Sequence, residues 1–166
     1  MKDIVDVCEI SRGGLYLYFA STRVLFEAVL EEEHARRAAV LEAVMAKGTT
    51  PGEQLLLYLD EQKKTILKKK DNLTAATYEY LFENNFTAKN NPVKKQFDEE
   101  AAVLAHLIAE GVAQEWMDCE DAAEAARNIL YTLEGLKVSA RAVGMTAERV
   151  DREIAYIMGT LGMVVK

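Results

Sequence analysis

Residues 11–21 read SRGGLYLYFAS, and this stretch decides how the first part of the chain folds. Ser11 stands where the N-cap of a short helix belongs, because its hydroxyl can accept a hydrogen bond from the first backbone N–H groups of the helix. The helix predicted after it runs to about Tyr18. Ser21 is the next cap candidate, and it opens a long helix that we expect to end near Lys47.

Another short helix is predicted before this stretch, over residues 2–9, with apolar residues along one face. Glu9 and Ile10 join it to the helix that Ser11 caps. Two short helices followed at once by a long one have the dimensions of a helix-turn-helix. Any helical protein offers short turns, so these dimensions alone assign no function.

The composition of the whole chain favours an all-α fold. Half of the 166 residues are hydrophobic, only two are Pro and nine are Gly, and no stretch alternates as a strand does. The net charge is −7, from 20 Lys and Arg against 27 Asp and Glu. This charge argues against a polybasic nucleic-acid coat or a surface that adheres to anionic membranes, so any DNA contact must be local.

Caps, prolines and apolar stripes divide the rest of the chain into further helices. Gly48 stops the long helix, and Pro51 suits a first helical turn. The predicted helices cover residues 51–68, 71–86, 92–117, 118–144 and 146–165, and their start signals are Pro51, Asp71 or Asn72, Asn91-Pro92, Asp118 and Thr146. We therefore expect two domains, a helix-turn-helix head with its connecting helix at residues 1–47 and a helical bundle at residues 48–166.

The segment from Ile4 to Leu25 resembles the recognition-helix signature of the TetR family of bacterial transcriptional regulators. The family pattern is I-A-x-x-A-G-V-S-x-G-x-L-Y-x-Y-F-x-S-K-x-x-L. The matching positions are Ile4, Ile10, Ser11, Gly13, Leu15, Tyr16, Tyr18, Phe19, Ser21 and Leu25. The resemblance implies a DNA-binding repressor that acts as a homodimer on double-stranded operator DNA and is released by a small-molecule effector.

The chemistry of the matched positions agrees with that role. Gly13 and Gly14 remove side chains, so backbone N–H groups at the start of the helix can approach phosphates or base edges. Arg12 can grip a phosphate or bridge O6 and N7 of guanine, and the hydroxyls of Tyr16 and Tyr18 suit phosphate oxygens. The predicted DNA-binding residues are Ser11, Arg12, Gly13, Gly14, Tyr16, Tyr18, Ser21 and Thr22.

Three departures from the family pattern affect these expectations. Thr22 stands where most members have a phosphate-binding lysine, and Arg23 is a candidate substitute. Glu9 replaces the usual turn glycine, so we expect a non-glycine residue in a left-handed conformation. Members of the family have a first helix before the position of Met1, and residues 1–47 hold six Lys and Arg against eight Asp and Glu. We therefore expect a shortened form that binds operator DNA weakly.

An effector pocket is expected among the helices between residues 52 and 143. Gln62 interrupts an apolar stripe, and a buried amide needs either a ligand or a neighbouring side chain as its partner. Aromatic side chains from several helices can supply walls. The predicted ligand-binding residues are Tyr58, Gln62, Tyr78, Phe82, His106, Trp116 and Tyr131. Core packing is the commoner role for such aromatic residues, and a partly exposed structural role is the commoner one for His106. No charge cluster fixes the sign of the effector.

Small residues in the last two predicted helices favour a homodimer. They allow two helices to approach closely beside an apolar stripe. They are Ala122, Ala123, Ala125, Ala126, Gly135, Ser139, Ala140, Gly159 and Gly162. The same residues could equally pack within one subunit.

Other site types find little support in the sequence. Glu31 and His34 have a metal-ligand spacing, but no second such pair accompanies them, so Glu31 is interpreted as part of a solvated acidic face. Cys8 and Cys119 form no C-x-x-C pair, which leaves neither a disulfide framework nor a zinc site and suits a reducing cytoplasm. No catalytic motif and no bilayer-spanning run is present. We expect no enzyme activity, no cofactor, no metal, no membrane contact, and a cytoplasmic location.

Two hypotheses for the function remain. The first is the ligand-responsive repressor that the resemblance implies. The second is a helical ligand-binding or interaction module whose head has lost DNA binding, which the acidic front and Thr22 favour.

Overall fold

The computed structural model describes residues 2–68, 73–87 and 89–163, and all of its regular structure there is α-helical. The all-α prediction is therefore confirmed. The chain forms two compact units, residues 1–40 and 41–166, and the long helix α3 (Thr22–Met45) continues from the first into the second. The predicted domain boundary at residue 47 remains a prediction.

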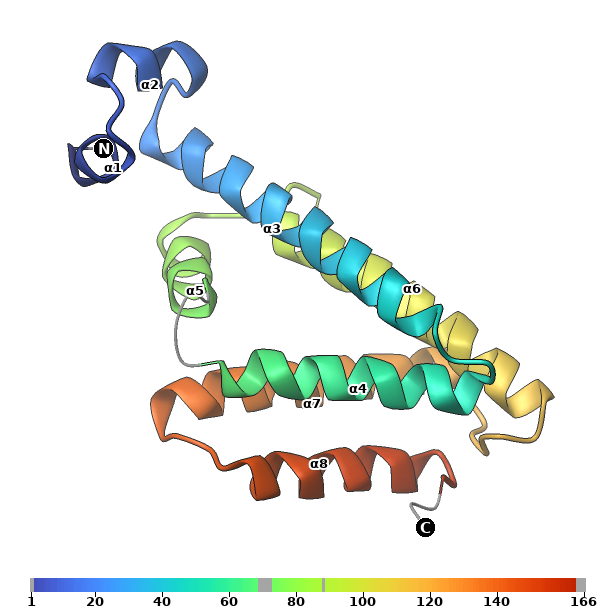
Figure 1. The fold of residues 1–166 in the computed structure, drawn as a ribbon. Helices are drawn as coiled ribbons and strands as arrows, with labels where there is room; N and C mark the ends of the chain where they lie inside the picture. Colours follow the sequence, from blue (N-terminus) through green and yellow to red (C-terminus); the bar gives the residue numbers. More distant parts are fainter. Residues whose placement is uncertain (1, 69–72, 88, 164–166) are drawn as a thin grey trace. The chain divides into compact units, whose positions relative to one another are not determined.

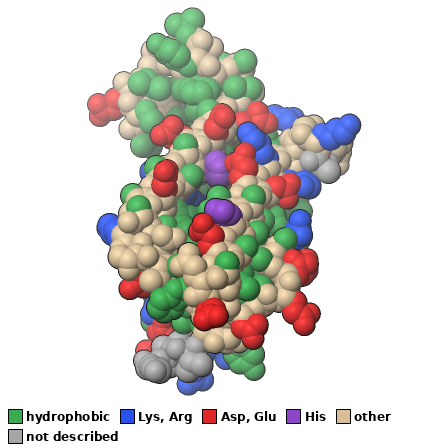
Figure 2. All heavy atoms as spheres, turned by 90° about the vertical axis from the view of Figure 1, so that its right-hand side faces the viewer, with side chains coloured by type: hydrophobic (Ala, Val, Ile, Leu, Met, Phe, Trp, Pro, Cys, Tyr) green, Lys and Arg blue, Asp and Glu red, His purple; other side chains and the backbone are tan. Residues whose placement is uncertain are grey.

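The first unit, called the head, contains two short helices and most of α3. Helix α1 spans Lys2–Cys8 and helix α2 spans Arg12–Tyr18. Leu15 and Leu30 are its buried apolar side chains, whereas Val7, Leu17 and Tyr18 each expose more than four fifths of their surface. Figure 2 shows hydrophobic side chains gathered over the head, at the top of the view. The head therefore keeps a small core and exposes several apolar side chains.

The second unit, called the body, is a bundle that begins with the last residues of α3. Its further helices are α4 (Pro51–Leu67), α5 (Thr74–Glu83), α6 (Pro92–Ala113), α7 (Ala122–Ala142) and α8 (Ala147–Thr160). Helix α4 contacts α6, α7 and α8, while α5 packs on α7; α6 crosses α4 obliquely (Figure 1). The core is filled from all four long helices, chiefly by Leu55, Tyr58, Leu59, Leu104, Ile108, Leu133, Val150 and Leu161.

Most predicted helix starts in the body are confirmed by their caps. The Thr50 hydroxyl accepts from the N–H of Glu53, whose carboxylate accepts in return from Thr50, and Pro51 follows in the first turn. Asn91 precedes Pro92 and caps α6, and Thr146 caps α8. Apolar spacing and cap chemistry therefore placed these helices correctly.

Several boundaries differ from the prediction. Helix α7 starts after Asp121, whose carboxylate accepts from two N–H groups, and not at Asp118. Asp118 lies in the preceding loop, where its N–H donates to the carbonyl of Leu161 at 2.8 Å, a tertiary contact that cap spacing does not reveal. Helix α5 ends at Glu83 and not at Phe86, and its predicted start at Asp71 or Asn72 lies outside the described residues.

Helix α6 ends at Ala113 and not at Met117. Helix α8 ends at Thr160, before the predicted end at residue 165, which lies outside the described residues, because the chain turns at Gly162, which has a positive φ. The ends of α3, α4 and α7 lie close to their predicted positions. Helix α3 ends at Met45, and Gly48 is needed just after it, because a Cβ there would lie 2.7 Å from Cγ of Gln54. Across the described ranges, no helix has the length and apolar character that a membrane crossing requires.

Candidate nucleic-acid interface and effector site

Helix α2 is capped as predicted. The backbone of Ser11 is extended, and its Oγ accepts a hydrogen bond from the N–H of Gly14 at 3.0 Å. A Cβ on Gly14 would lie 3.0 Å from that Oγ, so glycine at this position leaves room for the cap. A Cβ on Gly13 would meet nothing within 4 Å. Gly13 therefore leaves bare backbone facing open space at the positive end of the helix.

The side chains of α2 divide between the core of the head and solvent. Leu15 is 5% exposed, whereas Tyr16 and Tyr18 are 43% and 82% exposed. The guanidinium carbon of Arg12 lies 5.8 Å from the ring centroid of Tyr16, which favours a cation–π contact that orients both side chains. One buried leucine thus fixes a helix whose cation and phenols face outward.

The turns on either side of α2 also follow the sequence. Glu9 has φ 53°, so the expected left-handed non-glycine residue is present between α1 and α2. Ser21 caps α3, because its Oγ accepts from the N–H of Val24 at 3.2 Å, and Thr22 is exposed beside it. Arg23, the candidate substitute for a phosphate-binding lysine, pairs with Glu27 at 3.0 Å.

In the body, Tyr58 and Gln62 meet on one carboxylate. Tyr58 is fully buried, and its hydroxyl donates to Oε1 of Glu100 at 2.7 Å. The amide of Gln62 donates to the same oxygen at 3.2 Å. Gln62 thus finds its partner in a neighbouring side chain. Burial is the main cause that raises the pKa of Tyr58 far above its usual value, and the charge of Glu100 adds to it.

Tyr78 and Tyr131 lie on neighbouring parts of the body. The hydroxyl of Tyr78 donates to Oε1 of Glu134 at 2.9 Å, and burial followed by the charge of Glu134 raises its pKa. The ring of Phe82 lies 5.9 Å from that of Tyr78 and is 83% exposed. Tyr131 stacks on Phe97 at 5.0 Å.

The other two predicted ligand-binding residues lie elsewhere. Trp116 is half exposed in the loop before α7, and its ring lies against Gly52 at the start of α4. His106 lies on the exposed side of α6, where its Nε2 is 3.5 Å from a carboxylate oxygen of Glu110. Neither residue shares a hydrogen bond or a ring contact with the Tyr58 or Tyr78 groups within the described part of the chain.

Glu100 and Glu134 are the residues that sequence reasoning missed. Glu100 follows Phe97 by one helical turn, and Glu134 follows Tyr131 by one turn. An acidic residue at the edge of an apolar stripe was the available signal. In the sequence, such a residue cannot be distinguished from an acidic residue exposed to solvent. Only the tertiary structure shows that the phenols of Tyr58 and Tyr78 donate hydrogen bonds to these carboxylates.

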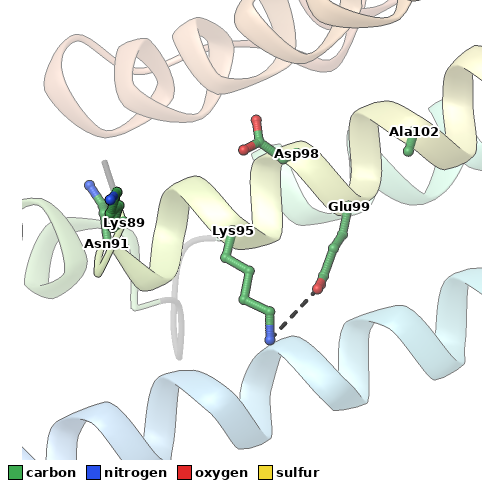
Figure 3. Close-up of a pocket in the computed structure, with 6 residues that line it drawn as sticks. All are labelled: Lys89, Asn91, Lys95, Asp98, Glu99 and Ala102. Carbon is green, nitrogen blue, oxygen red and sulfur yellow. Dashed lines mark ion pairs between the residues drawn. The ribbon is translucent and has the colours of Figure 1, made fainter. Parts of the chain in front are cut away.

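A surface hollow of about 450 Å³ lies at the start of α6, and none of the predicted residues lines it (Figure 3). Its walls are Lys89, Asn91, Lys95, Asp98, Glu99 and Ala102. Lys95 and Glu99 form an ion pair across it at 3.7 Å. Asn91 already uses its Oδ1 to cap the helix, accepting from the N–H groups of Val93 and Lys94. Asn91, Lys95 and Glu99 thus already have partners within the start of α6.

Metal and cysteine chemistry add nothing to these sites. No group of three or more His, Cys, Asp and Glu side chains among the described residues is arranged to hold a metal ion. Cys8 is exposed, Cys119 is half-buried, and both are free thiols.

The family described as "Tetracyclin repressor-like, C-terminal domain" matches residues 54–151, which is more than half of the chain. The chain belongs to the TetR family. Its head adds the helix-turn-helix that the TetR signature implied, and the predicted family is confirmed.

Relatives of known fold or name agree with this assignment. The uncharacterized HTH-type transcriptional regulator YfiR of Bacillus subtilis (strain 168) is 29% identical over 142 residues, which covers 82% of this chain and 67% of YfiR. The reduced form of Escherichia coli NemR superposes with a TM-score of 0.84 at 15% identity, covering 100% of this chain and 88% of NemR. NemR therefore shares the fold.

A second solved structure is closer in sequence. A transcriptional regulator of the TetR/AcrR family from Thermobifida fusca YX-ER1 is 25% identical with a TM-score of 0.69, covering 95% of this chain and 81% of that regulator. This TetR-family chain is thus a helix-turn-helix transcriptional regulator and not an enzyme. Regulators of the TetR family bind operator DNA.

Proposed function

We propose that this chain is a ligand-responsive repressor that reads operator DNA with α2. The observation that carries the proposal is the arrangement of α2 itself. Its N-terminus is capped by Ser11 and bare at Gly13, Arg12 and the two tyrosines are exposed, and Leu15 holds the helix to the head. Backbone N–H groups, a guanidinium and phenols are donors that recognise phosphates and base edges.

The charge distribution makes this contact a local one. Between Asp3 and Thr22 the sequence has a single Lys or Arg, which is Arg12. With few cations to displace counterions, binding should depend only weakly on salt, with a slope set by two or three phosphate contacts per head. Recognition of the operator then depends on Arg12 and the geometry of α2 more than on general electrostatic attraction between the head and DNA phosphates.

A homodimer supplies the second head. Gly135 and Gly159 lie on the exposed sides of α7 and α8, and a Cβ on either would meet nothing within 4 Å. Val138 and Tyr156 expose apolar surface on the same two helices. Bare glycines beside exposed apolar side chains suit close contact with the same helices of a second copy. A two-fold dimer would place two α2 helices in successive major grooves of a palindromic site.

Effector control requires two states of this dimer. In one state the spacing of the two heads fits the operator, and in the other it does not. A ligand that binds the second state more tightly shifts the dimer toward that state and so releases the operator. The last residues of α3 offer a physical link, because Leu41 and Met45 pack against the core of the body. We assign repression because a dimer that occupies an operator blocks transcription without any further contact surface.

Selection of bound DNA from a random duplex pool at low ionic strength tests the proposal. We expect an enriched inverted repeat. Arg12→Ala should weaken binding about 5- to 150-fold, the range for losing a bidentate base contact. Arg37→Ala is the matched control, since Arg37 is an exposed arginine of the head that pairs with Glu33. Failure to enrich any sequence would overturn the proposal in favour of a body whose head does not read DNA.

A further inference from the structure

Four aromatic rings and two carboxylates come together between α4, α5, α6 and α7. They are Tyr58, Tyr78, Phe97, Glu100, Tyr131 and Glu134, called here the aromatic–carboxylate cluster. Hydrogen bonds join Tyr58 to Glu100 and Tyr78 to Glu134, and ring stacking joins Phe97 to Tyr131. Phe97 and Tyr131 each stand one helical turn before the carboxylate of their own helix.

Glu100 is a half-buried carboxylate that forms no ion pair with a cation of any described residue. Its Oε1 accepts from two neutral donors, Tyr58 and Gln62, while Oε2 accepts no hydrogen bond from any described residue. The lysines of the same helix are paired elsewhere, Lys94 with Asp98 and Lys95 with Glu99. Removing a carboxylate from water without an opposite charge costs free energy. A cation that reaches Glu100 would therefore bind favourably.

Glu134 is only partly compensated. Lys137 lies 3.3 Å from its Oε2, and the Lys137 side chain is 14% exposed. Among the described residues, Lys137 is the one cation paired with either of these two carboxylates, and it contacts Glu134 alone, so the cluster carries a net negative charge. The raised pKa of Tyr58, after burial and Glu100, also reflects the charge of Glu134, so both carboxylates act on the same phenol.

The rings around these carboxylates are suited to the same kind of ligand. Aromatic faces attract organic cations, and desolvated aromatic surroundings strengthen that attraction. Part of the cluster is reachable from solvent, because Tyr131 is 62% exposed and Phe82, beside Tyr78, is 83% exposed. An apolar body would gain burial against these rings while its positive charge approached Glu100.

We infer that the effector is a lipophilic organic cation, such as a quaternary ammonium or phosphonium compound, bound at the aromatic–carboxylate cluster. The inference rests on the proposed function and adds to it the sign and class of the ligand. A cation beside Glu100 competes with Tyr58 and Gln62, two residues of α4, for the same carboxylate. Binding therefore acts directly on the hydrogen bonds between α4 and α6.

Two probes of the same shape and opposite charge test the sign of the site. Tetraphenylphosphonium and tetraphenylborate are titrated into the purified chain by isothermal calorimetry. We expect the phosphonium to bind and the borate to bind at least tenfold more weakly. Borate binding as tight as phosphonium binding, or binding of neither probe, would overturn the inference.

Amide variants locate the site. Glu100→Gln keeps a hydrogen-bond acceptor for Tyr58, and we expect it to weaken phosphonium binding at least tenfold. Glu134→Gln provides a second variant from another helix with the same expectation. Glu99→Gln is the matched control, because Glu99 is the exposed neighbour of Glu100 and changes the net charge equally. Equal affinities for the three variants would show only general attraction to a chain of charge −7.

Operator selection without any probe separates this inference from the proposed function. If the chain enriches an inverted repeat but binds no phosphonium, the repressor proposal stands and the cation site is wrong. If it binds phosphonium through Glu100 but enriches no DNA, the site stands and the repressor proposal fails.

Discussion

Leu15 and Leu17 lie two positions apart in α2 and experience opposite environments. Leu15 is 5% exposed and Leu17 is 84% exposed. We expect Leu15→Ala to destabilise the head by about 2–4 kcal/mol, because it removes one of few buried side chains, and Leu17→Ala to change stability by about 0.5 kcal/mol or less. Amide hydrogen exchange in α2 measures both. Equal loss of protection in the two variants would mean that Leu15 does not anchor the helix.

The buried phenol of Tyr58 should make the free energy of unfolding depend on pH in the alkaline range. Its folded-state pKa is raised above the usual 10.0, so the phenol stays protonated in the folded chain at pH values where the unfolded chain already loses this proton. The free energy of unfolding is therefore unaffected by this group below about pH 10 and falls above it.

Urea unfolding of Tyr58→Phe and the parent chain checks this sign. At pH 8 we expect the variant to be less stable by about 1 kcal/mol, the usual net worth of a hydrogen bond. Above pH 10 the difference should shrink, because only the parent contains this titrating phenol. A difference that stays constant between pH 8 and 11 would contradict the assignment.

Individual residues show where sequence reasoning succeeds and where it ends. Glu9 could be predicted in a left-handed conformation because the family pattern has glycine there, and Gln62 could be predicted to need a partner because it interrupts an apolar stripe. That the partner is Glu100 could not be predicted. The contact joins residues 38 positions apart, and the packing of α4 on α6 alone brings them together.

At the scale of elements, the α1–α2 turn carries strain that a single substitution should relieve. Glu9 has φ 53°, a conformation that costs an L-residue about 1 kcal/mol and glycine almost nothing. We expect Glu9→Gly to stabilise the head by up to about 1 kcal/mol, read from hydrogen exchange of α1 and α2 amides. Glu9→Ala, which keeps a Cβ, is the control and should show no such gain. A loss of protection in Glu9→Gly would show that the side chain of Glu9 matters more than its backbone.

Helix starts were predicted well where the local sequence offers a single cap residue and less well where it offers two. Ser11, Ser21, Asn91 and Thr146 cap their own helices through neighbouring N–H groups. Asp118 has the same side-chain chemistry, but it lies in a loop whose backbone is hydrogen-bonded to the carbonyl of Leu161, after the end of α8. Helix α7 therefore begins after Asp121, three residues later.

At the scale of the whole molecule, family membership fixes the order of the helices, while the chemistry of the body depends on packing. The head could be recognised because its residues contact one another within one short segment. The aromatic–carboxylate cluster combines residues of four helices. The sequence of each helix gives no sign that these residues lie close together in the folded chain. The proposed surface between two copies is also a property of the folded body, because only the structure shows that Gly135 and Gly159 are exposed.

Gly159→Arg tests that surface. Gly159 lies within α8 with open space around it, so an arginine can be accommodated in an isolated chain, and replacing glycine inside a helix should favour that helix by about 0.5–1 kcal/mol. In a dimer the same arginine would be buried without a partner charge at a cost of several kcal/mol. Light scattering at micromolar concentration should therefore find the parent chain as a dimer and Gly159→Arg as a monomer that unfolds no more easily.

Gly135→Arg should behave like Gly159→Arg, whereas Ala109→Arg, on the exposed side of α6, should remain a dimer. A monomeric parent chain would refute the dimer, and dissociation of the Ala109 variant would place the contact surface on another helix.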